Sequence, residues 1–125
     1  MGANCAHNWS MYWEGASKRS YTPERLAAIN AATVSYNGKD ISRYKATLMQ
    51  RSYERKIRAE KRAFLVAKES GQKDAEKAAA GKLAASREQL KDFLGQTGLH
   101  QYQLRESVPG FGRSEAASAA AQAKK

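Results

Sequence analysis

The sequence predicts a mainly α-helical protein, in which an antiparallel two-helix hairpin follows a short N-terminal helix and a small β-hairpin. Two long stretches, residues 42–70 and 73–94, carry apolar residues at the spacing of one helix face. Between them stands Gly71, and glycine commonly follows the last residue of a helix. Two amphipathic helices joined by so short a turn are expected to lie antiparallel and to cover each other's apolar stripe.

The first part of the chain, residues 1–22, shows neither the period of a strand nor that of a helix. We interpret it as an irregular lead-in that its aromatic residues anchor against the helices or against a partner. These aromatic residues are Trp9, Tyr12 and Trp13. The order Thr22-Pro23-Glu24 is typical of a helix start, with threonine as the cap and proline at the first helical position. A short helix is therefore expected over residues 23–30.

A β-hairpin is expected at residues 33–41. Val34 and Tyr36 alternate with polar residues before Asn37-Gly38, the dipeptide that best tolerates positive φ in a two-residue turn. A hairpin this short is marginal unless it packs on a helix.

Ser42 is placed to cap the first long helix, whose apolar positions keep a helical period with one polar interruption at Glu60. This helix is expected to end near Ser70-Gly71, and the second to run from Lys73 to Leu94. The predicted core consists of Met49, Tyr53, Ile57, Phe64, Leu83, Leu90 and Phe93.

Residues 23–107 are expected to form one helical module, and residues 108–125 a flexible or helical tail. The sequence PGFG at 109–112 predicts a turn around Phe111. The stretch SEAASAAAQAKK that follows has no large apolar residue, so it is expected to be either a solvated helix or a frayed tail.

The charge of the chain favours an acidic partner. The formal net charge is +10, and residues 42–69 hold nine Lys or Arg against three Glu. Helical spacing brings four arginines onto one ridge, and we take them together with Lys61 as candidate contact residues for acidic protein or nucleic acid. These candidates are Arg51, Arg55, Arg58, Lys61 and Arg62. No base-reading motif is present, so a nucleic-acid contact would be to the backbone and not sequence-specific.

The alternative interpretation of this ridge is a solvated face, whose charges pair with Glu54, Glu60 and the acidic residues of the second helix.

No catalytic, cofactor or metal site is predicted, and we expect the protein not to be an enzyme. Cys5 and His7 look like half of a metal site, but His100 is the only other histidine and there is no second cysteine, while zinc takes four ligands. No stretch approaches the roughly 18 apolar residues of a membrane span, so no membrane partner is expected.

Several segments resemble the C-terminal region of the tailed-phage minor capsid protein 2 family. In order they are NCAH with Trp13-Glu14-Gly15, the YTPERL helix start, the block SYNGKDISRYKATLMQRSYERKIRAEKR, and TGLHQYQLRES, which together span most of residues 4–107. The resemblance implies a non-catalytic structural module associated with head assembly, located in the virion and in contact with other virion subunits.

The chain departs from the family at Ala6, where the family usually carries Arg, and in length, since family members have a long N-terminal portion before the matching region. Two other functions therefore stay open. One is a free-standing small phage protein that binds and inhibits a host nucleoprotein, such as a CRISPR effector, in the host cytoplasm. The other is a non-specific nucleic-acid-binding protein.

Overall fold

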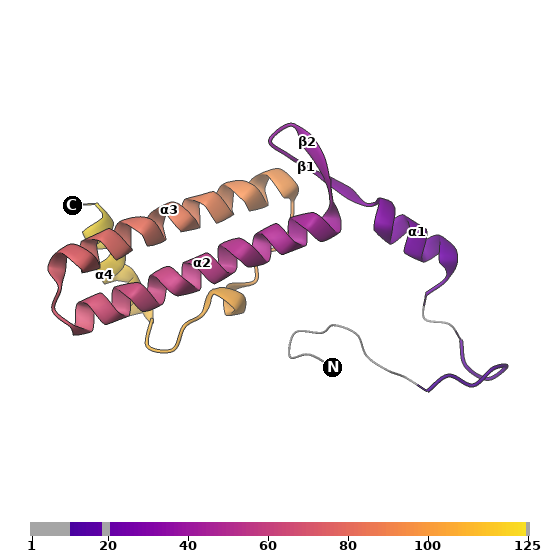
Figure 1. Ribbon diagram of the computed structural model, residues 1–125, viewed down its shortest axis with the longest axis horizontal. Helices are drawn as coiled ribbons and strands as arrows, with labels where there is room; N and C mark the ends of the chain where they lie inside the picture. Colours follow the sequence, from indigo (N-terminus) through magenta and orange to yellow (C-terminus); the bar gives the residue numbers. More distant parts are fainter. Residues whose placement is uncertain (1–10, 19–20, 125) are drawn as a thin grey trace.

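The structure is a computed structural model, which describes residues 11–18 and 21–124. Its elements in chain order are α1 (Pro23–Ala31), β1 (Thr33–Tyr36), β2 (Lys39–Ser42), α2 (Arg43–Glu69), α3 (Lys73–Thr97), the short 3₁₀ helix η1 (Gln103–Glu106) and α4 (Arg113–Ala123). Helices α2 and α3 run side by side in opposite directions, with the β-hairpin and α1 at one end and α4 near the other (Figure 1). The predicted fold class is confirmed.

Both predicted helix caps are present. The Thr22 hydroxyl accepts a hydrogen bond from the Arg25 backbone N–H at 3.3 Å, and the Ser42 hydroxyl accepts one from the Lys45 N–H at 3.2 Å. Each satisfies a backbone donor that has no partner within its own helix. The cap residues thus fix where α1 and α2 begin.

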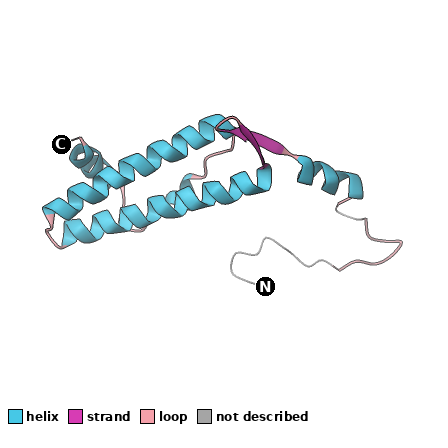
Figure 2. Ribbon diagram, turned by 45° about the horizontal axis from the view of Figure 1, so that its top comes forward, coloured by secondary structure: helices cyan, strands magenta, loops and turns pink. Residues whose placement is uncertain are grey.

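The β-hairpin pairs Val34 with Ile41 in antiparallel register, and Asn37 and Gly38 both have positive φ, 51° and 72°. Two positive φ values are what a two-residue type I′ turn requires. The ring of Tyr36 packs edge-on against Phe93 of α3, with centroids 5.0 Å apart. The hairpin therefore has the helix packing that a two-stranded sheet needs, and it lies at the open end of the helical pair (Figure 2).

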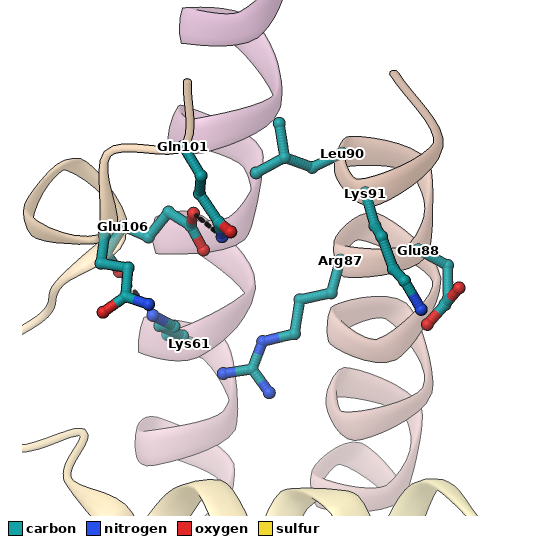
Figure 3. Close-up of a pocket in the computed structure, with 8 residues that line it drawn as sticks. Lys61, Arg87, Glu88, Leu90, Lys91, Gln101 and Glu106 are labelled. Carbon is teal, nitrogen blue, oxygen red and sulfur yellow. Dashed lines mark hydrogen bonds between the residues drawn. The ribbon is translucent and has the colours of Figure 1, made fainter. Parts of the chain in front are cut away.

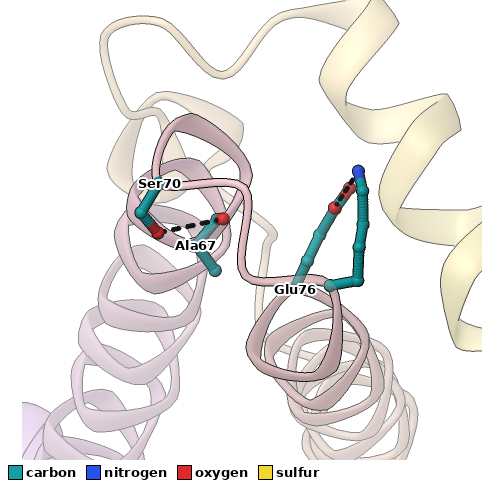
Figure 4. Close-up of polar contacts among 4 residues, drawn as sticks. Ala67, Ser70 and Glu76 are labelled. Atoms are coloured by element: carbon teal, nitrogen blue, oxygen red, sulfur yellow. Dashed lines mark hydrogen bonds and ion pairs between the residues drawn. The ribbon is translucent and has the colours of Figure 1, made fainter.

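A glycine-based cap ends α2 and turns the chain into α3. Gly71 has φ +69°, its N–H donates to the Lys68 carbonyl at 3.2 Å, and the Gln72 N–H donates to the Ala67 carbonyl at 3.1 Å. These two bonds form a Schellman motif, which satisfies carbonyls that lack helical partners. The Ser70 hydroxyl also donates to the Ala67 carbonyl, at 3.2 Å (Figure 4). At the start of α3, the buried Glu76 forms an ion pair with Lys73.

Gly71→Ala is expected to lower the free energy of unfolding by about 1–2 kcal/mol, because alanine disfavours the left-handed conformation. Gly81→Ala is the matched control. A Cβ meets nothing within 4 Å at either position, but Gly81 lies inside α3 without positive φ. The control should raise the unfolding free energy by about 0.5–1 kcal/mol. Urea denaturation measures both, and equal signs would contradict the cap assignment.

The core lies between α2 and α3. Five of the predicted core residues are at most 2% exposed, and they are Ile57, Phe64, Leu83, Leu90 and Phe93. Met49 and Tyr53 are half-buried, and Tyr53 packs against the Phe93 ring with centroids 5.3 Å apart.

The buried face of α2 is more polar than the sequence pattern predicted. Instead of one interruption at Glu60, the structure buries Gln50, Glu54 and Lys61. For Gln50 and Lys61 the reason is that the segment after α3 folds back along α2 and offers main-chain carbonyls that accept from these two side chains. Gln50, for example, donates to the His100 carbonyl at 2.8 Å.

Helix α3 ends three residues later than predicted. It continues through Gly95 to Thr97, and Gly98 at φ +66° donates its N–H to the Leu94 carbonyl at 2.9 Å. The left-handed conformation at Gly98 is what stops the helix.

The C-terminal tail is helical and is packed on α3, not solvated or frayed. Ala119 of α4 is 2% exposed and belongs to the same core cluster as Ile57 and Leu83. Alanine side chains allow two helices to approach closely, so α4 is held without any large apolar residue of its own. It follows a turn with Pro109 and Gly110 (φ +81°), closed by a 3.1 Å bond from the Phe111 N–H to the Val108 carbonyl.

Two of the aromatic residues of the lead-in, Tyr12 and Trp13, lie within the described residues and are largely exposed. Tyr12 and Trp13 are 55% and 66% exposed, and Trp9 lies outside the described residues. Anchoring against the helices is therefore wrong for Tyr12 and Trp13, and anchoring against a partner stays a prediction.

Candidate functional site

The basic candidates on α2 divide into two groups. Arg51, Arg55 and Arg62 are exposed and Arg58 is half-buried, whereas Lys61 is only 8% exposed. The structure thus removes Lys61 from the exposed basic surface.

Three of the predicted arginines surround one surface cavity of about 450 Å³, which we call the arginine cavity. It is lined by Leu48, Arg51, Glu54, Arg55, Arg58 and Arg105. Arg62, which continues the same helical ridge, is not among the lining residues. The cavity therefore concentrates four guanidinium groups that come from two elements, α2 and η1.

Arg105 is the member of this cavity that the sequence did not indicate. It reaches α2 because η1 packs against that helix, and its guanidinium stacks over the Tyr102 ring, 4.0 Å from the centroid. The Arg58 guanidinium donates through Nη1 to the Arg105 carbonyl, which ties η1 to α2. These contacts hold Arg58 and Arg105 in place while Arg51 and Arg55 remain exposed.

A buried carboxylate lies among these arginines. Glu54 is 2% exposed, and its Oε1 has no hydrogen-bond partner among the residues that the structure describes. Burial raises the pKa of Glu54, and the positive charge of Arg105 opposes part of that rise. The cavity is therefore strongly positive overall, with one destabilised negative group in its lining.

Lys61 faces a second cavity of about 440 Å³ between α2, α3 and the returning segment (Figure 3). Its Nζ donates to the Glu106 carbonyl, and Gln101 donates to the Glu106 carboxylate at 2.8 Å. Burial lowers the pKa of Lys61, and the charge of nearby Arg87 lowers it further. The bond from Lys61 to Glu106 thus ties the returning segment to α2 at this cavity, while the bond from Gln101 to Glu106 is made within that segment.

The ridge arginines form no ion pair within the described part of the chain. The two ion pairs found there are Lys68 with Glu115 at 3.5 Å and Lys73 with Glu76 at 3.0 Å. The alternative in which the ridge pairs with Glu54, Glu60 and the acidic residues of the second helix is thus not seen among these residues. The arginine charges remain available to a partner.

Residues 11–18 and 21–124 contain no group of three or more His, Cys, Asp or Glu side chains placed to hold a metal ion. Cys5 and His7 lie outside the described residues. Among the helices that the structure describes, none has the length and apolar character to cross a bilayer.

Residues 1–95 match the family model described as Phage minor capsid protein 2. The chain belongs to the phage minor capsid protein 2 family. The matched region takes in α1, the β-hairpin, α2 and most of α3, and so includes Arg51, Arg55 and Arg58. It stops before TGLHQYQLRES, a segment that the sequence resemblance had included, and therefore before Arg105. Comparison of this family member with curated proteins and with solved structures gave no match.

Proposed function

We propose that the chain is a non-catalytic structural and interaction module of a phage head, which contacts acidic protein or nucleic acid through the basic face of α2. Membership of the minor capsid protein 2 family supports a place in the virion among other virion subunits. The observation that carries the basic contact is the set of arginines around the arginine cavity, which have no ion pair among the described residues.

The arginines of the cavity have unused hydrogen-bonding capacity. Each guanidinium carries five N–H donors in a planar fork that matches carboxylate and phosphate groups. Within the described residues, the side-chain donors of the cavity arginines make one hydrogen bond, from Arg58 to the Arg105 carbonyl. An anionic partner would accept hydrogen bonds from these donors and neutralise the local positive charge. Inhibition of a host nucleoprotein and non-specific nucleic-acid binding stay alternative predictions.

The test is binding of the purified chain to two fluorescent probes, random duplex DNA and a short peptide of alternating Glu and Ala, at low and at physiological salt. At least one probe should bind, with an affinity that falls linearly on a log–log salt plot because exposed charges are screened and counterions are released. Replacing both Arg51 and Arg55 with Glu should weaken that binding by about tenfold or more.

The matched control changes net charge equally on the other helix. Lys77 and Lys82 are exposed residues of α3, and replacing both with Glu should weaken binding much less. Failure of both probes to bind at low salt would contradict the proposed contact, and so would equal losses in the two double variants.

A further inference from the structure

We propose that the arginine cavity is a carboxylate-binding socket, which receives an Asp or Glu side chain from an acidic segment of a neighbouring protein. This inference rests on the proposed function and narrows it, because it selects one kind of anion and one place on α2.

The four arginines line one cavity. Arg51, Arg55 and Arg58 fall within about 10 Å along the axis of α2, and η1 adds Arg105 to the same cavity from a different part of the chain. Four forks around one hollow suit a small planar anion that accepts paired hydrogen bonds. A binding surface for a nucleic-acid backbone would instead spread its cations to follow successive phosphates.

The rest of the α2 ridge supports a socket over an extended track. Lys61 is buried and bonded to the Glu106 carbonyl, and Arg62 does not line the cavity. Of the five predicted contact residues, only Arg51, Arg55 and Arg58 therefore line this cavity.

The uncharged member of the lining favours a protein side chain as the source of the anion. Leu48 is 44% exposed and gives the cavity an apolar wall that suits the methylene groups of an acidic side chain. Such a side chain carries its charge on an apolar stem, so its methylene groups can cover Leu48 while the carboxylate accepts hydrogen bonds from the arginines.

The test compares two arginines on the same exposed ridge, one inside the cavity lining and one outside it. With the Glu-Ala peptide as the probe, Arg55→Glu should lower affinity by about tenfold or more, and Arg62→Glu by less than about threefold. Arg55→Lys keeps the charge but loses the planar fork, so it should also lower affinity several-fold. Circular dichroism establishes that each variant keeps its helices.

Four results would overturn the socket. Equal losses for Arg55→Glu and Arg62→Glu, or full affinity in Arg55→Lys, would mean diffuse electrostatic attraction. Tighter binding of duplex DNA than of the peptide, with equal dependence on both arginines, would mean a phosphate track; the proposed basic contact would then stand without the socket. No binding of either probe would defeat the socket and the proposed contact together.

Discussion

Ile57→Asp is expected to unfold the α2–α3 pair. Ile57 is 0% exposed and lies in one cluster with Phe64, Leu83 and Leu90, so a carboxylate at this position has neither water nor a partner. Loss of the buried side chain costs about 2–5 kcal/mol, and the unpaired charge adds to that cost. The sum approaches or exceeds the net stability of about 5–15 kcal/mol that is usual for a small domain. Far-UV circular dichroism should show most of the helical signal lost at room temperature.

Val66→Asp is the matched control, since it makes a closely similar change, from a β-branched apolar residue to Asp, on the same helix. Val66 is 67% exposed, and its replacement should change the free energy of unfolding by less than about 1 kcal/mol. If the two variants melted alike, the face of α2 that we assign to the core would be wrong. Leu90→Asp, on the facing side of α3, should behave as Ile57→Asp does.

The features that the sequence predicted correctly are set by neighbouring residues. The caps at Thr22 and Ser42 bond to N–H groups three residues away, and the turn at Asn37-Gly38 depends on which residues tolerate positive φ. The two long helices follow from apolar spacing. Each of these signals lies within a few residues of its effect, so no knowledge of the tertiary structure is needed to use it.

The features that were missed depend on contacts between distant parts of the chain. Gln50 and Lys61 are polar residues that a periodicity argument places toward solvent, yet their partners are the carbonyls of His100 and Glu106, 50 and 45 residues away. The packing of α4 on α3 could not be predicted from the sequence either, because an alanine-rich stretch has the same residue pattern whether it packs or is solvated.

In the candidate site, too, local spacing predicted some residues and tertiary structure placed another. Helical spacing brought Arg51, Arg55 and Arg58 together, and all three line the arginine cavity. Nothing in the local sequence indicated that Arg105 would join them, because its position depends on how the segment after α3 folds back.

Glu54→Gln is expected to stabilise the protein at neutral pH. Burial raises the pKa of Glu54, so the ionised carboxylate destabilises the folded state, and its Oε1 has no hydrogen-bond partner among the described residues. Glutamine has nearly the same shape and carries no charge. The gain in unfolding free energy should be about 1–3 kcal/mol, because the variant no longer buries an ionised group that lacks a full set of donors.

The dependence of this gain on pH identifies its cause. The pKa of Glu54 in the folded state lies above its ordinary value of 4.5, so the folded chain holds the proton more tightly than the unfolded chain does. Well below pH 4.5 the carboxyl is protonated in both states, and the part of the stability difference that the charge causes should vanish. As the pH rises through the folded-state pKa, the wild type should lose stability relative to the variant. Glu88→Gln, at an exposed position on α3, should show no such divergence. Urea denaturation across this pH range measures the difference, and a gain that persisted unchanged at low pH would mean that packing, and not the buried charge, accounts for it.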